Sequence, residues 1–208
     1  MNQSVKFWDR IAKFYSKQAI ANVPAYEKKL EVTRGYLRPD STVLEFGCGT
    51  GSTAIVHAPF VKHVRATDVS AKMLEIAREK AKAQGVGNIV FEQQSIDELQ
   101  VADASIDAVL GLSILHLLED RDAAIAKVHR MLKPGGVFVS NTVCMGDGMK
   151  WFRRVAPLGA FLGLLPLVKF FGPADLERSL KDAGFQIDYN WQPPGGRSVF
   201  IVAKKAAR

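Results

Sequence analysis

The sequence of 208 residues predicts a single α/β domain, built on a mostly parallel sheet that ends in an antiparallel hairpin. Strand-like and helix-like stretches alternate five times along the chain, which requires right-handed crossovers and a parallel sheet with helices on both faces. The last two strand-like stretches are joined only by residues 193–196, a connection too short for a parallel crossover. We therefore expect a doubly wound sheet of seven strands, the last two antiparallel.

Two helices are expected before the first strand. In residues 4–19 (SVKFWDRIAKFYSKQA), apolar side chains recur at helical spacing on a stripe that includes Trp8 and Tyr15. Residues 25–37 form the second helix, closed by the Pro-Asp pair that follows. We assign residues 1–38 to an N-terminal helical segment, in which Tyr15 could fold over a ligand or pack into the core.

The remaining elements alternate in a regular order. A helix is expected at residues 53–58, another at 70–85 with Ser70 as its N-cap and Gly85 as its stop, and a third at 120–132, ended by Lys133-Pro134-Gly135-Gly136. A last helix is expected at 173–184. Apolar or alternating stretches predict strands at 41–46, 63–69, 88–93, 105–113, 137–143, 185–192 and 197–205.

Composition limits the classes of function. Lysine and arginine number 28 against 21 acidic residues, and the resulting charge of +7 attracts anions such as phosphates, acidic head groups or nucleic acid. The basic residues are spread along the chain, so a solvated basic surface explains them as well. Cys48 and Cys144 cannot make a disulfide framework, and the N-terminus has no apolar signal core. We expect a cytoplasmic protein.

The stretch VLEFGCGTG, residues 43–51, changes from apolar to glycine-rich where the first strand ends. Ligands of open parallel sheets bind beyond the carboxyl ends of the strands, where glycines let backbone N–H groups approach and a helix N-terminus favours anions. Asp68 ends the second strand, where its carboxylate can accept hydrogen bonds from both hydroxyls of a ribose. Ser52 stands where the dinucleotide fingerprint needs its third glycine, which together with the hairpin argues against NAD.

Five stretches in this order resemble class I S-adenosylmethionine-dependent methyltransferases: VLEFGCGTG, ATDVSAKMLEIAR, IDAVLGLSILHLLED, RMLKPGGVFV and DLERSLKDAGF. Within that class the chain is most similar to small single-domain enzymes resembling ubiquinone and menaquinone biosynthesis methyltransferases. The resemblance covers residues 40 to 203 approximately. It implies a Rossmann-like fold, S-adenosylmethionine as cofactor, a cofactor-binding core at residues 40–145, and a closing helix and hairpin at 173–204.

The resemblance also implies where the cofactor binds. Residues 45–51 would enclose its methionyl end, Asp68 would bind the ribose, and the turn Ser95-Ile96 would receive the adenine edge. Many relatives carry an aspartate where Ser95 stands, so the serine hydroxyl or the Ile96 backbone would have to replace that contact. The residues so implied, with Tyr15 from the first helix, are Tyr15, Glu45, Phe46, Gly47, Gly49, Gly51, Asp68, Val69, Met73, Ser95, Ile96, Leu112 and Ser113.

Methyl transfer from a sulfonium requires mainly an in-line alignment of nucleophile, methyl and sulfur, and a general base only for a protonated acceptor. His116, just past the fourth strand, is the best candidate base, although it could equally cap or pack against the neighbouring loop. We interpret His57, His63 and His129 as surface residues. No His, Asp and Glu set has the spacing of metal ligands, so we expect no metal.

The segment most informative about the acceptor is the insertion at residues 147–172. Its apolar run, residues 155–168, is too short for a bilayer span and is broken by Pro157 and Pro166. It could be a lid over an apolar acceptor pocket, an interfacial helix in peripheral contact with a membrane, or a dimer or core contact. The first two indicate a small hydrophobic acceptor, lipid-like or quinone-like. Residues 112–115 (LSIL) lack the polar-Pro-Pro-aromatic tetrad of amino-methylating DNA enzymes, which argues against nucleic acid. RNA methylation and cofactor binding without turnover are the alternative functions.

Overall fold

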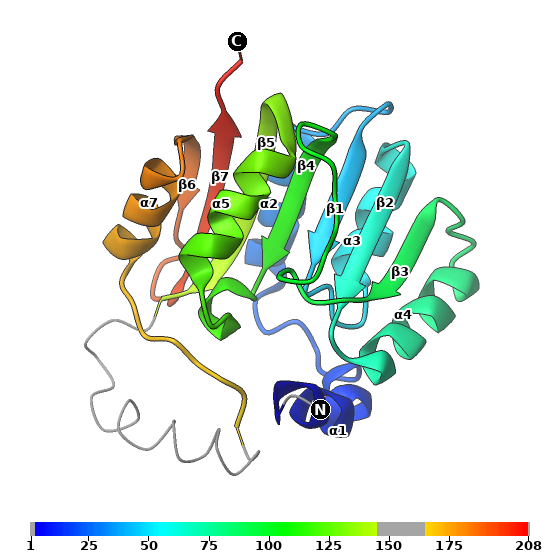
Figure 1. Cartoon of the computed structure of the whole chain (residues 1–208). Helices are drawn as coiled ribbons and strands as arrows, with labels where there is room; N and C mark the ends of the chain where they lie inside the picture. The colour runs from blue at the N-terminus through cyan, green and yellow to red at the C-terminus, as the bar shows by residue number, and fades with distance from the viewer. Residues whose placement is uncertain (1–2, 145–164, 208) are drawn as a thin grey trace.

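The computed structural model describes residues 3–144 and 165–207. Seven strands form one sheet in the order β3-β2-β1-β4-β5-β7-β6, with helices packed on both of its faces (Figure 1). The strands are β1 (Thr42–Phe46), β2 (His63–Asp68), β3 (Ile89–Gln93), β4 (Ile106–Leu112), β5 (Leu132–Val143), β6 (Phe185–Trp191) and β7 (Ser198–Lys205). The α-helices are α1 (Gln3–Tyr15), α2 (Val23–Arg34), α3 (Ser52–His57), α4 (Ala71–Ala83), α5 (Arg121–Met131) and α7 (Pro173–Asp182), with short 3-10 turns η1 (Ala58–Phe60) and η2 (Leu115–Leu117).

The topology confirms the predicted fold class. Strands β1 to β5 pair in parallel, whereas β7 pairs antiparallel with both β5 and β6. From β1 the chain proceeds outward through β2 and β3, and it then returns to place β4 on the other side of β1. The strand order therefore reverses between β1 and β4, and the carboxyl ends of these two strands border the crevice where such sheets bind ligands.

Alternation along β1 explains how the sheet is buried on both faces. Successive side chains of a strand point to opposite faces, and here Val43 and Leu44 are both fully buried but belong to different apolar clusters. The cluster around Leu44 includes side chains of α5 and α7, and the cluster around Val43 includes side chains of α3 and α4. The sheet therefore forms the middle layer of three, and only its edges and ends are open to ligands.

Most element boundaries agree with the sequence within a few residues, and Ser70 caps α4 as predicted by accepting a hydrogen bond from the backbone N–H of Met73 at 3.1 Å. One boundary was wrong. The Lys133-Pro134-Gly135-Gly136 stretch was expected to separate a helix from the next strand, but β5 already begins at Leu132 and contains it. The pairing of β5 with β4 shifts in register there, and Gly135 has a positive φ of 77°. An irregular strand start thus replaces the expected loop.

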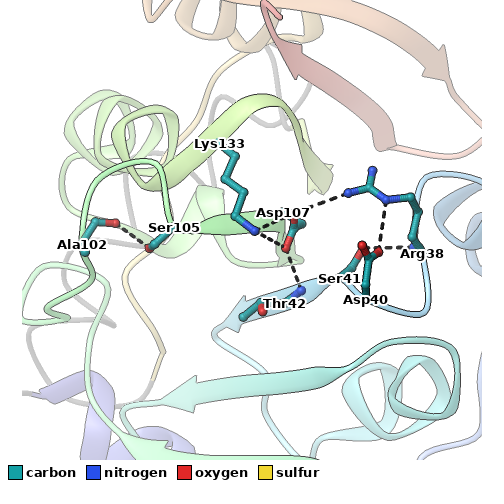
Figure 2. A network of polar contacts seen from close by, with 8 residues as sticks. All are labelled: Arg38, Asp40, Ser41, Thr42, Ala102, Ser105, Asp107 and Lys133. Carbon is teal, nitrogen blue, oxygen red and sulfur yellow. Dashed lines mark hydrogen bonds and ion pairs between the residues drawn. The ribbon is translucent and has the colours of Figure 1, made fainter.

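A polar network joins the amino ends of β1, β4 and β5 (Figure 2). Asp107 accepts hydrogen bonds from Lys133 Nζ through both carboxylate oxygens at 2.9 Å and from the backbone N–H of Thr42 at 2.9 Å. Arg38 lies 3.6 Å from the same carboxylate. Both carboxylate oxygens of this half-buried acid therefore have partners, at the end of the sheet opposite the crevice.

Among the described residues, no helix is both long and apolar enough to cross a membrane.

Candidate functional site

The glycine loop between β1 and α3 has a backbone that side chains rarely allow. Gly47, Gly49 and Gly51 have φ values of 65°, 54° and 72°, in the left-handed region. A Cβ on Gly47 would lie 2.6 Å from Ile114 Cγ1, so space as well as conformation requires glycine there. The loop therefore keeps its backbone close to the crevice beside β4.

Asp68, at the end of β2, fixes this loop through its carboxylate. Oδ2 accepts a hydrogen bond from the Gly49 N–H at 2.8 Å, and Oδ1 accepts one from the Ser70 N–H at 2.9 Å. Burial raises the pKa of this carboxyl, while the backbone donors act in the opposite direction. A carboxylate offers about four acceptor positions, so each oxygen retains capacity for a ligand hydroxyl.

Gly51 has a different role from the one the sequence suggests. It lines neither of the two cavities described below. A Cβ at this position would lie 2.9 Å from both Ala77 Cβ and Phe91 Cε1, so this glycine allows the loop to pack against α4 and β3. Gly51 therefore contributes to the site by shaping the loop and not by facing a ligand.

The larger cavity, cavity one, has a volume of about 340 Å³ and lies between the glycine loop, α2 and the segment that follows α1. Its wall combines hydroxyl, amide and charged groups with a few apolar side chains. The residues that line it are Tyr15, Ser16, Gln18, Ala19, Ile20, Tyr26, Lys29, Leu30, Thr33, Glu45, Gly47, Cys48, Gly49, Thr50, Ser52, Thr53, His57, Lys80, Leu112, Ser113, Asn141 and Phe200.

The smaller cavity, cavity two, has a volume of about 120 Å³ and lies on the other side of the loop, toward β3 and η2. Its wall is mainly apolar and aromatic, with Asp68 as a buried acid. The residues that line it are Trp8, Tyr15, Phe46, Gly47, Gly49, Asp68, Val69, Met73, Gln94, Ser95, Ile96, Asp97, Leu112, Ser113, Ile114, Leu117 and Leu118.

The two cavities share Tyr15, Gly47, Gly49, Leu112 and Ser113, and they therefore adjoin along the loop and the end of β4. Of the residues expected to bind a cofactor, all except Gly51 line one or both cavities. Tyr15 lies at the shared rim with 43% of its surface exposed. The structure thus brings the predicted residues into one elongated site of two compartments.

Ser113 occupies a strained position at the boundary between the compartments. Its φ of 58° places a non-glycine residue in the left-handed region, which costs on the order of 1–3 kcal/mol. The Ser113 N–H donates to the Asn141 carbonyl at 2.6 Å, and this bond to β5 holds the conformation. Strain of this kind typically persists at functional sites, because the surrounding structure enforces it.

Glu45 is a buried acid without a partner. Its side chain lines cavity one, and Oε2 has no hydrogen-bond partner among the described residues. Burial raises the pKa of this carboxyl to about 8, and the nearby charge of Asp68 adds to the shift. A buried polar atom of this kind is normally satisfied, so the position fits a ligand that brings a cationic donor.

Lys29, on α2, is a second charged residue in cavity one and was missed by sequence reasoning. Its ammonium lies 3.5 Å from Asn141 Oδ1 and has no carboxylate partner in the part of the chain that the structure describes. Burial lowers the pKa of this lysine. No local pattern could have revealed it, because α2 reaches the cavity only through its packing across the end of the sheet.

His57 was expected at the surface, and this prediction was wrong. Its side chain is only 1% exposed at the end of α3 and lines cavity one. Neither ring nitrogen has a hydrogen-bond partner among the described residues, and burial, followed by the charge of Arg34, lowers its pKa to about 4. The available signal was its spacing of four residues from Thr53 in the helix that starts at the loop, since i and i+4 share a helix face.

His116, the candidate base, is buried in η2 and lines neither cavity. Its Nδ1 has no partner among the described residues, and burial lowers its pKa to about 4. The His116 carbonyl accepts a hydrogen bond from the Lys169 N–H at 2.8 Å. The described end of the apolar insertion therefore passes beside this histidine, whereas residues 145–164, with most of the expected lid, lie outside the described residues.

Ser95 lies in cavity two, but its hydroxyl is already engaged. Ser95 Oγ donates to Glu98 Oε2 at 3.0 Å. Asp97, two residues further along, lines the same cavity and was not predicted. Many relatives carry an acid at position 95, and in this chain Asp97 supplies a carboxylate from the same turn.

Comparison with known proteins agrees with this geometry. The family described as "Methyltransferase domain" matches residues 43–136, which include the glycine loop, Asp68 and β4. The uncharacterized methyltransferase YcgJ of Bacillus subtilis is 32% identical over 102 residues, covering 49% of this chain and 40% of YcgJ. The ubiquinone/menaquinone biosynthesis C-methyltransferase UbiE of Vibrio campbellii is 32% identical over 113 residues, covering 52% of this chain and 44% of UbiE. The matched part thus spans about two fifths of each relative.

Solved structures show the same fold over most of the chain. The crystal structure of YcgJ has a TM-score of 0.71 at 18% identity and covers 88% of this chain and 100% of that one. The structure titled as the [4+2]-cyclase SpnF has a TM-score of 0.74 at 17% identity and covers 92% of this chain and 86% of that one. Residues 43–136 therefore match a methyltransferase domain, and the described chain has the Rossmann-like fold of these solved structures.

Proposed function

We propose that the chain transfers the methyl group of S-adenosylmethionine to a small, mainly apolar acceptor. The observation that carries the proposal is the pair of adjoining compartments, one with a buried acid for a sugar and the other with opposite charges for an amino acid. A single elongated ligand with a nucleoside at one end and a zwitterion at the other matches both. The residues present therefore fit this cofactor.

The nucleoside end is assigned to cavity two. Asp68 accepts the ribose hydroxyls with the acceptor positions that the loop amides leave free. Val69 and Met73 pack on the adenine, and its polar edge meets the Ile96 backbone and Asp97. We assign the edge contact to Asp97 in preference to Ser95, because the hydroxyl of Ser95 is already bonded to Glu98.

The amino-acid end is assigned to cavity one. An α-ammonium would satisfy the Glu45 oxygen that has no partner among the described residues, and an α-carboxylate would pair with Lys29. Charge-assisted hydrogen bonds of this kind are about twice as strong as neutral ones. The two charged residues would therefore orient the ligand along the loop.

When bound, the cofactor would supply a methyl group on a positively charged sulfur. As the acceptor bonds to the methyl carbon, the electron pair of the broken C–S bond would stay on sulfur. The chain contributes alignment and exclusion of water. Leu112 and Ser113, at the boundary of the compartments, hold the acceptor in line, and Tyr15 covers the rim. His116 lines neither cavity and its pKa is lowered to about 4, so we assign it no role in the transfer.

We infer an apolar acceptor because the apolar insertion at residues 147–172 is proposed to act as a lid over the acceptor pocket. Within the described part of that insertion, Phe171 is buried and packs beneath the Arg121 guanidinium at 4.2 Å. This contact anchors the C-terminal end of the insertion next to the carboxyl ends of the strands. UbiE, whose name refers to ubiquinone and menaquinone biosynthesis, supports an acceptor of quinone type. Cofactor binding without methyl transfer is the second candidate, because a protein named as a cyclase shares this fold.

Calorimetric titration of Asp68→Asn with S-adenosylhomocysteine tests the cofactor assignment. We expect affinity to fall by about 10- to 100-fold, since charge-assisted hydrogen bonds contribute on the order of 1.5–3 kcal/mol. Asp103→Asn, an exposed acid outside both cavities, is the matched control and should bind as the wild type does.

A 2′,3′-dideoxy analogue of the same ligand separates the ribose contact from damage to the loop. The wild type should lose affinity for the analogue, whereas Asp68→Asn should bind both ligands alike. Equal losses in both proteins would contradict the ribose contact. Radiolabelled methyl transfer to a panel of quinols, phenols and lipids then tests turnover, and binding without transfer to any acceptor would favour the second candidate.

A further inference from the structure

Exposed apolar side chains are concentrated in one short segment. The described residues include six large hydrophobic side chains that are well exposed, and four of them lie between positions 14 and 23. Phe14 is 70% exposed, Tyr15 43%, Ile20 49% and Val23 48%. The end of α1 and its connection to α2 thus present apolar surface of a kind that marks interaction sites when it is contiguous.

Basic side chains accompany this apolar surface. Lys6, Arg10 and Lys13 follow the i, i+4, i+7 pattern, so they share one face of α1, and Lys17 continues it past the helix end. All four are exposed, and Phe14 lies beside them on the helix. The sequence has no acidic residue from Arg10 to Tyr26.

The acidic residue Asp9 of α1 and the neighbouring Glu75 of α4 both have partners on α4 or its N-cap. Asp9 accepts hydrogen bonds from Ser70 Oγ at 2.6 Å and from the Lys72 N–H at 3.2 Å. Glu75, on α4, pairs with Lys72 at 2.9 Å, and this bond lowers its pKa first, with a smaller contribution from Lys13. The outer face of α1 therefore keeps an excess of positive charge.

The same segment borders the functional site. Helix α1 lies at the end of the molecule where the parallel strands terminate (Figure 1), and Tyr15, Gln18 and Ile20 line cavity one. An occupant of this surface would be adjacent to the mouth of the cavity. An apolar acceptor could pass from one to the other without crossing open water.

We propose that residues 6–23 form a docking surface for an anionic lipid bilayer. Exposed Phe and aliphatic side chains insert at the level of the head groups, and the flanking lysines contact acidic lipids. Ile20 and Val23 favour a bilayer over nucleic acid, because aliphatic side chains offer no ring for base stacking. Delivery of an acceptor from the bilayer rests on the proposed function, whereas bilayer binding does not.

Co-sedimentation of the full chain with vesicles tests the proposal. Vesicles of phosphatidylcholine with phosphatidylglycerol should retain the protein, vesicles of phosphatidylcholine alone should retain much less, and high salt should weaken binding. Phe14→Ser should reduce binding by about tenfold or more, because the variant removes the most exposed of the large apolar side chains on this surface. Lys13→Gln and Lys17→Gln should each reduce it about fivefold.

Matched controls lie elsewhere on the surface. Val90→Ser removes an exposed apolar side chain of β3 (45% exposed), and Lys82→Gln removes an exposed lysine at the far end of α4. Both should bind vesicles as the wild type does. Equal binding to both vesicle types, or unchanged binding in Phe14→Ser and Lys13→Gln, would overturn the proposal. Cofactor titration of the same variants reports separately on the proposed function, since a folded variant with normal affinity isolates the docking defect.

Discussion

The two ends of strands β1 and β4 differ in how their acidic side chains are partnered. At the amino ends, Asp107 is bonded to Lys133 and to the Thr42 backbone (Figure 2). At the carboxyl ends, Glu45 is more deeply buried, yet one of its oxygens has no partner among the described residues. Satisfied networks stabilise a fold, whereas an unsatisfied buried group indicates a place where binding supplies the missing partner. The comparison predicts that variants at the two ends will lose different properties.

The largest effect is expected from Asp107→Asn, which tests the amino ends. The substitution removes a carboxylate that accepts three hydrogen bonds, so the free energy of unfolding should fall by about 2–3 kcal/mol. Cofactor affinity should not change, because Asp107 lines neither cavity. Urea denaturation and calorimetry measure the two quantities. A loss of affinity in a folded variant would show that the two ends are not independent.

Glu45→Gln should give the opposite result. We expect cofactor affinity to fall about tenfold, since a neutral amide cannot balance an ammonium. The free energy of unfolding should stay level or rise, because the variant no longer buries an ionisable group. The same two measurements apply. A variant that loses stability but binds normally would place Glu45 with the structural acids and contradict its proposed role.

The pH dependence of stability tests the same comparison between the two ends of the strands, and its expected effect is smaller. Burial raises the pKa of Glu45 from 4.5 to about 8, so between these values the folded chain binds more protons and becomes less stable as pH rises. His57 and His116, with pKa values lowered from 6.5 to about 4, give the opposite slope only below pH 6.5. From pH 6.5 to 8 we expect the unliganded protein to lose about 1 kcal/mol. Thermal denaturation should show this slope, and its persistence in Glu45→Gln would assign it to another group.

Sequence patterns predicted the parts of the site that depend on local structure. The glycine loop, Asp68 at the end of β2, and Ser113 after β4 are each positioned by a strand that ends at the crevice, so their place follows from the topology. Loop conformation was harder to anticipate. Gly51 belongs to the same glycine pattern but packs against α4, because the chain turns away from the crevice there.

The residues that were missed depend on packing between distant elements. Lys29 enters cavity one because α2 lies across the end of β5, where Asn141 meets it. His57 is buried because α3 is covered by α2, and a short helix gives little pattern from which to infer which side is covered. Neither position could be derived from spacing alone. The same limit explains why residues 133–136, near the start of β5, were taken for a loop, since the pairing of this stretch with β4 involves a register shift.

The hydrogen bonds that Asp68 accepts from Gly49 and Ser70 limit which substitutions at this position could change the choice of methyl donor. On the proposed function, the acid that binds the ribose also holds the glycine loop and the Ser70 N-cap of α4. A sequence that adopted a donor without a ribose diol would still need this brace. On that proposal, a replacement of Asp68 would disturb the loop together with the sugar contact, so a single replacement at this position could not change donor preference alone.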